Sequence, residues 1–473
     1  MAVLHPILTI ALLILVVLTI FNIIIFVHEL GHFLAAKWRG LQVDRFQIWF
    51  GKPIWKKTIG GVQYGLGWIP AGGFVALPQM APMESIEGSN RENEEKDSKP
   101  LPPIKPLDKI IVAFAGPLFS MLLALAAAFV VWGVGKPKDK IPVQTIGFVE
   151  SGSPADKSGM KPGDKVIEIN GKPVDGFTGT LDSIKERIIL SSSDEIVFTV
   201  IREGEEEPIK LRSKFDIPET QWWERGGLRR VGISYASKPV VHSTLKKSPA
   251  SKKGLKKGDE ILSVDGKHLY SPAQLGQYLQ ENEWKTVTLK VRSKDGVERE
   301  LEIKPVRPEE PEGRDPMLGI RWDDTREIDL RIVHPGPLEQ VYGSVEMMWV
   351  TITSLANPKS EVGFDHLSGP VGIGGLMYDL IQTENGWRRI LAFMVLFNVN
   401  LAVLNMLPMP VLDGGHITLA ILEKICGGPV GTKPLEIIQT ICALALLTLM
   451  LYVTSKDVAD RFDRGGTEVV FPE

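Results

Sequence analysis

The chain carries two histidines and a glutamate inside a stretch that is apolar enough to cross a membrane. Between Pro6 and Ala36 most side chains are apolar, yet this range contains the pattern His28-Glu29-Leu30-Gly31-His32. About 20 apolar residues suffice for a helix that spans a bilayer. Because ionisable side chains are costly in hydrocarbon, their presence there indicates a functional site.

The spacing of these residues is that of a metal-binding pair with a base beside it. His28 and His32 are four residues apart and therefore lie on one face of a helix. Two neutral imidazoles so placed can bind one zinc ion, and Glu29 points close enough to take a proton from water at the metal. The HExxH pattern is typical of metalloproteases. In a soluble helix it also occurs by chance, but an unpaired set within a transmembrane helix has no inexpensive structural explanation.

The apolar residues of the 473-residue chain are concentrated at its two ends. Four candidate spans cover residues 4–36, 107–134, 390–412 and 435–453, and the middle, from about Lys136 to Arg331, reads as soluble. Four spans place both termini and the soluble middle on one side of the membrane. The first span lacks the charged start of a cleaved signal peptide and is too long for one.

The charge distribution bears on orientation and partners. Six basic residues between Lys37 and Lys57 follow the first span, which favours the cytoplasm for that loop, although three lysines after the second span argue the other way. We give the first cluster more weight, so the soluble middle is expected outside the cytoplasm. The net charge of −3 predicts no nucleic-acid partner. The only cysteines, Cys426 and Cys442, leave the soluble middle without a disulfide framework.

Residues 41–106 are expected to form a β-region and a loop. Residues 50–79 are rich in glycine, aromatic and β-branched side chains, which predicts short strands or hairpins. Such backbone is tolerated at membrane depth only against protein or a cavity, so a membrane re-entrant β-region is predicted, with a plain cytosolic hairpin as the alternative. Residues 80–106 are charged and proline-rich and predict a loosely held cytosolic loop.

The soluble middle contains a repeat at an offset of 95 residues. Ser153-Pro154-Ala155, Gly159, Gly163-Asp164 and Asn170-Gly171 recur as Ser248-Pro249-Ala250, Gly254, Gly258-Asp259 and Asp265-Gly266. In each copy a short helix, a strand and a tight hairpin turn are predicted. The pattern resembles bacterial PDZ domains, which implies two α+β domains at 141–227 and 228–307 that bind peptide C-termini by strand addition. We assign Val231-Gly232-Ile233, with Gly232 as a binding residue, to the carboxylate-binding loop of the second domain.

Between the second domain and the third span, residues 308–388 are expected to form an amphipathic helix and a linker. Leu338–Leu355 is amphipathic and would lie on the membrane surface, cover the site or form part of a core. Gly369–Gly375 is expected to be a flexible connection.

A third metal ligand is expected in the third transmembrane segment, 389–416, since a catalytic zinc usually has three protein ligands. Asp413 is its only acid, and Pro408 and Pro410 would bend the chain back toward the first helix. A helix-terminating Asp-Gly-Gly turn is the alternative, and His416 is a weaker candidate ligand. A fourth transmembrane helix and a tail are expected over 417–473.

Several further residues are candidates for binding substrate. Asn405 is suited to hold a substrate carbonyl or an oxyanion, and Asn400 lies in the same apolar segment. Both amides could instead bond between helices. We add Pro408 and the glycines Gly65 and Gly67 of the β-region, which would help to hold a substrate extended.

These motifs together resemble a known family. HELGH in the first helix (1–40), the run from Asn405 to Gly415 and the PDZ-like repeats between them resemble the site-2 proteases, and most closely the bacterial regulator-of-sigma-E proteases. The resemblance implies that His28, His32 and Asp413 bind Zn²⁺ and that Glu29 is the catalytic base. In the second helix (107–135) the family's AGPxxN motif has Ser120 in place of asparagine, which leaves the role of that amide in doubt.

The resulting expectation is a multi-span α-helical membrane protein with about four transmembrane helices, a membrane re-entrant β-region and two inserted α+β PDZ domains. The resemblance implies a zinc intramembrane endopeptidase of the bacterial inner membrane. Its substrates would be single-span membrane proteins such as pre-cleaved anti-sigma factors. Leftover signal peptides would be a second class of substrate. The PDZ domains would be periplasmic and the zinc site near the cytoplasmic face. A catalytically inactive PDZ scaffold is the main alternative, and a transporter is a weaker one.

Overall fold

The computed structural model describes residues 4–80, 104–311, 313–323, 327–428, 432–463, 469 and 471–472. The chain forms two compact units. The first comprises residues 1–137, 332–352 and 368–455, and the second comprises 138–331, 353–367 and 456–473. Of the predicted loop at 80–106, residues 81–103 lie outside the described residues.

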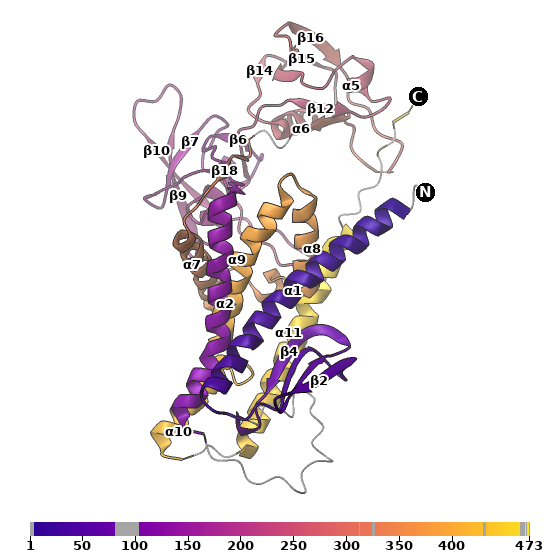
Figure 1. Ribbon diagram of the computed structural model, residues 1–473. Helices are drawn as coiled ribbons and strands as arrows, with labels where there is room; N and C mark the ends of the chain where they lie inside the picture. The colour runs from indigo at the N-terminus through magenta and orange to yellow at the C-terminus, as the bar shows by residue number, and fades with distance from the viewer. Residues whose placement is uncertain are drawn as a thin grey trace. The chain divides into compact units, whose positions relative to one another are not determined.

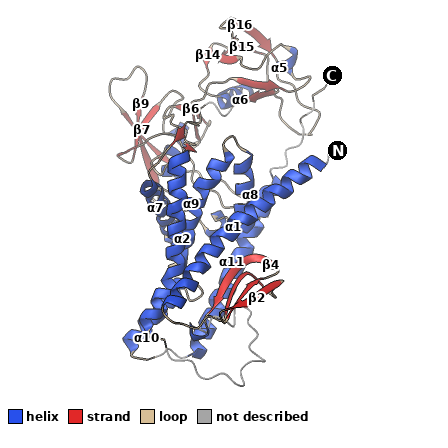
Figure 2. Cartoon of the chain, in the orientation of Figure 1, coloured by secondary structure: helices blue, strands red, loops and turns tan. Residues whose placement is uncertain are grey.

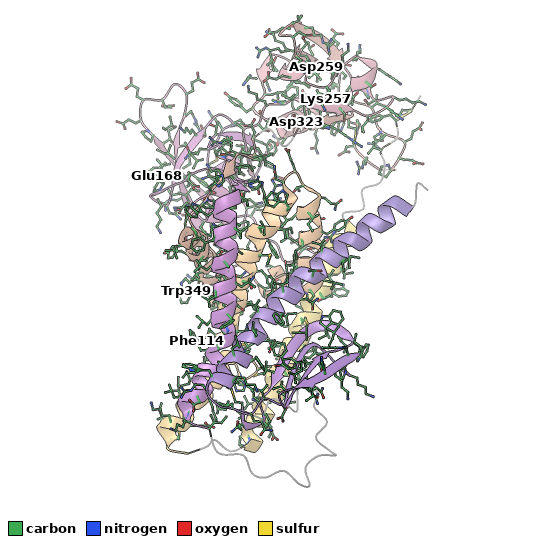
Figure 3. All side chains as sticks on the ribbon, viewed as in Figure 1. Phe114, Glu168, Lys257, Asp259, Asp323 and Trp349 are labelled. Atoms are coloured by element: carbon green, nitrogen blue, oxygen red, sulfur yellow. The ribbon has the colours of Figure 1, made fainter. Side chains whose placement is uncertain are left out.

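Four long helices dominate the first unit (Figure 1). They are α1 (Leu4–Trp38), α2 (Pro106–Val134), α9 (Gly386–Asn405) and α11 (Thr432–Asp463), whose last turns belong to the second unit. Each is long and apolar enough to cross a membrane, which confirms the four predicted spans among the described residues. Large apolar side chains such as Phe114 of α2 are exposed, as expected for a surface that faces lipid (Figure 3).

Three further helices lie in the C-terminal half of the chain. The predicted amphipathic helix is confirmed as α7 (Pro337–Ala356). The flexible connection predicted at Gly369–Gly375 is wrong, because these residues belong to α8 (Pro370–Gln382), which starts with a proline in its first turn. The predicted bend in the third segment is confirmed: α9 ends at Asn405, and α10 (Asp413–Cys426) starts after Pro408 and Pro410.

The predicted β-region is a four-stranded sheet in the order β2-β3-β1-β4 (Figure 2). Its strands are β1 (Arg45–Phe50), β2 (Trp55–Ile59), β3 (Val62–Leu66) and β4 (Ile69–Ala76), followed by the 3₁₀ turn η1 (Pro78–Met80). β1 and β3 run parallel, and Gly60-Gly61 joins β2 to β3 with both residues at positive φ. β4 contacts α1: a Cβ added at Gly73 would lie 3.2 Å from Cγ of Glu29.

The second unit contains the two predicted α+β domains. The first has β6 (Ile146–Val149), α3 (Pro154–Lys157), β7 (Lys165–Ile169), β8 (Lys172–Pro173), α4 (Ile184–Ile189), β9 (Glu195–Ile201), β10 (Ile209–Lys214) and β11 (Ile233–Tyr235). The second has β12 (Val241–Thr244), α5 (Pro249–Lys252), β13 (Glu260–Val264), β14 (Lys267–His268), α6 (Pro272–Glu281), β15 (Val287–Arg292), β16 (Glu298–Ile303) and β17 (Ile320–Trp322). Their main sheets, β10-β9-β7-β8 and β14-β13-β15-β16, have corresponding strand orders.

The local details predicted from the repeat are confirmed. Ser153 and Ser248 cap the short helices α3 and α5, and their hydroxyls accept a hydrogen bond from the backbone three residues on. Asn170-Gly171 and Asp265-Gly266 all have positive φ, which is the conformation of a tight type I′ hairpin turn.

The predicted boundary between the two domains is wrong. β11 pairs with β6, and Val231 lies in the core of the first domain, so the loop around Gly232 belongs to the first domain rather than the second. In the same way β17 pairs with β12, which extends the second domain beyond residue 307 to Trp322. The reason is topological, since the last strand of each domain returns to pair with its first strand.

Each domain contains one buried aspartate that is paired with an arginine. Asp164 is 1% exposed and accepts hydrogen bonds from Nε and Nη2 of Arg202 at 2.7 and 2.8 Å. Its counterpart Asp259 (Figure 3) is 3% exposed and pairs with Arg299 at 2.7 Å. Buried carboxylates need such partners, so these pairs fix the loop that leads into the first strand of each main sheet.

The substitution Asp164→Asn tests this role. It should lower the free energy of unfolding of the first domain by about 2–3 kcal/mol, because a bidentate contact to a buried charge is lost. Hydrogen–deuterium exchange of β7 and β9 in the full-length protein measures the effect. The matched control is Asp182→Asn, whose carboxylate pairs with Arg187 but is itself 69% exposed, so the pair should contribute less than about 1 kcal/mol. Equal effects of both substitutions would contradict the proposed importance of burial.

Candidate active site

Three metal-ligating side chains meet where α1 and α10 approach each other. His28 and His32 lie on one face of α1, with 3.3 Å between their Nε2 atoms. Asp413, the first residue of α10, places Oδ2 3.2 Å from Nε2 of His28 and Oδ1 3.3 Å from Nε2 of His32. These three side chains form the one group of histidine, cysteine and acidic residues among the described residues that could hold a metal ion.

Hydrogen bonds from α2 orient both imidazoles. Nδ1 of His32 lies 2.8 Å from the carbonyl oxygen of Val112, which can only accept, so Nδ1 carries the proton and Nε2 has a free lone pair. Nδ1 of His28 lies 2.9 Å from Oγ of the fully buried Ser120. Holding the second ring nitrogen in this way is how proteins orient metal-binding histidines. Ser120, which stands in place of the motif's asparagine, therefore holds the ring of His28 through its hydroxyl.

The donor set fits a zinc ion. Oδ2 of Asp413 is buried and has no hydrogen-bond partner among the described residues. Three lone-pair donors that face one another repel unless a cation lies between them. For tetrahedral zinc, with bonds to nitrogen or oxygen of about 2.0–2.2 Å, the donor atoms are expected roughly 3.3–3.5 Å apart. The two imidazole nitrogens are 3.3 Å apart, and each lies 3.2–3.3 Å from one oxygen of Asp413, Oδ2 for His28 and Oδ1 for His32, which is close to that expectation.

Two glycines permit α1 and α2 to come this close. A Cβ added at Gly31 would lie 2.4 Å from the carbonyl oxygen of Ala115. One added at Gly116 would lie 2.2 Å from Nε2 of His32 and 2.9 Å from Nε2 of His28. Any side chain at either position would therefore separate the helices or displace the imidazoles.

The chain returns to α1 through the turn between α9 and α10. A Cβ added at Gly414 would lie 2.3 Å from the carbonyl oxygen of Leu407, and one at Gly415 2.1 Å from that of Met409. The two glycines thus let α10 pack on its own preceding turn. A salt bridge of 2.7 Å between Lys109 and Glu423 holds α10 to α2.

A cavity of about 170 Å³ contains the three ligands and Glu29. Its other lining residues come from β4 and the residues after it, from α2, and from the end of α9 and the start of α10: Val75, Leu77, Met80, Val112, Ala113, Asn405, Val411, Leu412 and His416. A carboxylate beside three ligands in a confined, partly apolar space is suited to move a proton during hydrolysis.

Of the other predicted site residues, some line the cavity and others do not. Asn405 lines the cavity, as does His416, although His416 is not in the ligand group. Asn400 has a buried Oδ1 without a hydrogen-bond partner among the described residues, and Pro408 lies in the turn between α9 and α10.

The glycines predicted in the β-region are displaced from the site. Gly65 lies in β3, against Gln47 and Trp55, and Gly67 lies against Trp49 and Phe50. The glycine beside Glu29 is instead Gly73 of β4. Sequence reasoning missed Gly73, Gly116 and the role of Ser120. Gly116 and Ser120 could have been found from the AGPxxS run, because small and polar residues in a transmembrane helix indicate a close helix contact.

Comparison with known proteins identifies the family. The model of peptidase family M50 matches residues 16–449, most of the chain. The chain belongs to peptidase family M50. It is 28% identical to regulator of sigma-E protease RseP of Escherichia coli K12 over 463 residues, which cover 91% of this chain and 94% of that protein. It is also 28% identical to a candidate zinc metalloprotease of Neisseria meningitidis serogroup A, over 92% of this chain and 96% of the relative.

A third relative, protease RseP of Yersinia pestis, is 28% identical over 91% of this chain and 94% of its own length. The resemblance to site-2 proteases predicted from the sequence is thus confirmed at the level of the family. The M50 protein described here is a metalloprotease of the membrane.

The substitution Gly116→Ala tests the packing of this metal site. The added methyl group would collide with both imidazoles, so zinc content per purified chain should fall well below that of the wild type. Gly133→Ala is the matched control, since Gly133 lies in the same helix and a Cβ there meets nothing within 4 Å. The control should retain zinc, and its helix should gain about 0.5–1 kcal/mol. Full zinc content in the Gly116 variant would contradict the assigned geometry.

Proposed function

We propose that this protein is an intramembrane zinc endopeptidase that cleaves the transmembrane segments of single-span membrane proteins. The observation that carries the proposal is the meeting of His28, His32 and Asp413 with Glu29 in one cavity that lies among apolar helices. The relatives' names agree with this activity, since one is called regulator of sigma-E protease.

In this proposal His28, His32 and Asp413 hold the zinc ion, which, when bound, polarises the scissile carbonyl and makes water more acidic. Glu29 accepts a proton from the attacking water and delivers it to the nitrogen of the leaving amide. The carbonyl of Val112 keeps His32 in the required tautomer, and the hydroxyl of Ser120 holds the ring of His28 in position. Asn405 lines the same cavity and would donate its amide hydrogen to the substrate carbonyl oxygen.

The substrate would be held as an extended strand beside Glu29. β4 is the last strand in the order of its sheet, and its Gly73 contacts Glu29. A peptide that adds to such a strand exposes its backbone to the catalytic groups. We also propose that the substrates include anti-sigma factors already trimmed by another protease, in a bacterial inner membrane with the soluble domains periplasmic and the zinc site near the cytoplasmic face.

We assign the two α+β domains as PDZ domains that restrict access to the site. In the second domain, a groove of about 340 Å³ lies between α6 and the residues that lead into β17, and apolar side chains such as Leu275, Leu279 and Leu318 line it. Such a groove is suited to an apolar peptide C-terminus.

The substitution Glu29→Gln tests the catalytic assignment. Cleavage of a tagged single-span substrate by the purified protein should fall by at least about 100-fold, because the proton acceptor is lost. Zinc content should stay near one ion per chain, since all three ligands are kept. Glu423→Gln is a control: this carboxylate joins α10 to α2 outside the cavity lining. Normal cleavage by the Glu29 variant would refute the assignment, and absence of both zinc and cleavage in the wild type would favour an inactive scaffold.

Deletion of the soluble domains tests their role as a filter. The ends of the insertion are held together, because β5 (Lys136–Pro137) pairs with β18 (Ile332–Val333). Replacing residues 138–331 by a short Gly-Ser linker should therefore keep the membrane unit intact. We expect the shortened protein to cleave a substrate with a folded external domain that the full-length protein rejects, in a side-by-side cleavage assay. The same deletion with Glu29→Gln is the control, and loss of all cleavage of a short substrate would count against the filter.

A further inference from the structure

Three exposed aromatic side chains lie on two segments that hydrogen bonds tie to the end of the last membrane helix, through Lys456 of that helix and through Arg225. Trp222 and Trp223 are 84% and 47% exposed, and their rings form an edge-to-face pair with centroids 5.6 Å apart. Phe364, in the 3₁₀ turn η3 (Phe364–His366), is 52% exposed. We call these three residues the aromatic cluster. Neither the catalytic site nor the peptide groove uses them.

Arg225 fixes the aromatic cluster to α11. Its Nε and Nη2 atoms donate to Asp460 and Asp457 of α11 at 2.6 and 2.7 Å. Its Nη1 donates to the carbonyl oxygens of Asp365 and Leu367 at 2.5 and 2.7 Å, which holds the turn that carries Phe364. One guanidinium therefore joins the linker of the first soluble domain, the turn after α7 and the end of the helix.

A lysine of α11 also binds the turn that carries Trp222 and Trp223. Lys456 is 5% exposed, and its Nζ donates to the carbonyl oxygens of Trp222 and Glu224, both at 2.6 Å. Within the turn, the carboxylate of Glu224 accepts a hydrogen bond from the backbone of Gln221. Hydrogen bonds from α11 and within the turn thus hold the backbone that carries the two exposed indoles.

The position of Lys456 along α11 sets the depth of the cluster in a bilayer. The apolar part of α11 runs from Leu435 to Val453, which is 19 residues by sequence number, and polar residues follow from Thr454. At 1.5 Å per residue this part is about 28 Å long, close to the hydrocarbon thickness of about 30 Å. Lys456 comes three residues later, about 4–5 Å past the hydrocarbon edge and within a headgroup layer of about 5–7 Å.

We propose that the aromatic cluster is a lipid-binding surface that anchors the first soluble domain in the headgroup layer beside α11. Tryptophan is favoured at this depth because its ring is apolar while its N–H still finds a polar partner. The phospholipid bilayer is the occupant that this geometry selects, because Lys456 of a membrane helix binds the backbone carbonyls of Trp222 and Glu224, which flank the indole of Trp223, at the level of the headgroups.

Tryptophan quenching in the full-length protein tests this anchor. The protein is placed in nanodiscs of phosphatidylcholine brominated close to the headgroup, and its fluorescence is compared with that of Trp222→Phe/Trp223→Phe. Two of the 11 tryptophans are removed in this variant. The difference in emission between the wild type and this variant gives the fluorescence of Trp222 and Trp223. We expect this fluorescence to be strongly quenched by the brominated lipid and weakly by aqueous acrylamide. Both side chains are substantially exposed, so the variant should fold normally.

The control is Trp284→Phe/Trp322→Phe, which removes two tryptophans packed against the core of the second domain. The fluorescence of Trp284 and Trp322, obtained as the difference between the wild type and this control variant, should be insensitive to brominated lipid. Arg225→Gln provides a second test, because release of the turn should reduce lipid quenching of the pair while Trp222 and Trp223 are still present. The proposal is overturned if the pair is quenched by acrylamide and not by lipid. Quenching by neither would also overturn it and would indicate protein, such as a second copy of the chain, over the cluster.

Discussion

The close contact between α1 and α2 is the constraint on which the active site depends. It requires glycine at 31 and 116, because the backbone of one helix and the imidazoles of the other occupy the space of a side chain. Only at this distance do Val112 and Ser120 reach the ring nitrogens of His28 and His32. α2 supplies no ligand itself, yet its Val112 carbonyl determines which nitrogen of His32 faces the metal, and its Ser120 hydroxyl holds the ring of His28. Among apolar helices few other groups can hydrogen-bond an imidazole, so the contacts of Val112 and Ser120 with the two rings are as necessary as the ligands themselves.

The third ligand depends on a break in the helical structure. A straight helix through residue 413 would continue along the direction of α9, whereas the turn after Asn405 starts a new helix with Asp413 at its first position. The turn supplies its own backbone partners, with Met409 bonded to Leu407 and Leu412 to Met409. Internal hydrogen bonds of this kind allow irregular backbone among membrane helices. The turn thus brings Asp413 to the two histidines, and its place in the first turn of α10 fixes its backbone conformation.

Sequence reasoning succeeded where a short-range pattern determines the structure. The four-residue spacing of the histidines, the apolar spans and the turns at Asn170 and Asp265 follow from local periodicity or local backbone preference. Sequence reasoning failed where the structure depends on contacts between residues that are far apart in the sequence. The loop at Gly232 adjoins the second domain in sequence but pairs with β6, more than 80 residues earlier. Similarly, the glycine-rich β-region gave no signal that Gly73, rather than Gly65 or Gly67, would face Glu29, because that choice depends on how β4 packs against α1.

A sheet beside the catalytic groups addresses the main energetic obstacle to cleaving a helix in a membrane. The carbonyl to be attacked is hydrogen-bonded within the substrate helix, and freeing a backbone group in hydrocarbon costs several kcal/mol. A substrate that pairs with a strand exchanges its helical hydrogen bonds for interstrand ones instead of losing them. β4 lies next to Glu29 and is held by β1 over most of its length, so it is rigid enough to act as such a template. Unwinding and positioning would then be a single step, and the same strand that lowers the cost of extension would align the scissile bond with Glu29.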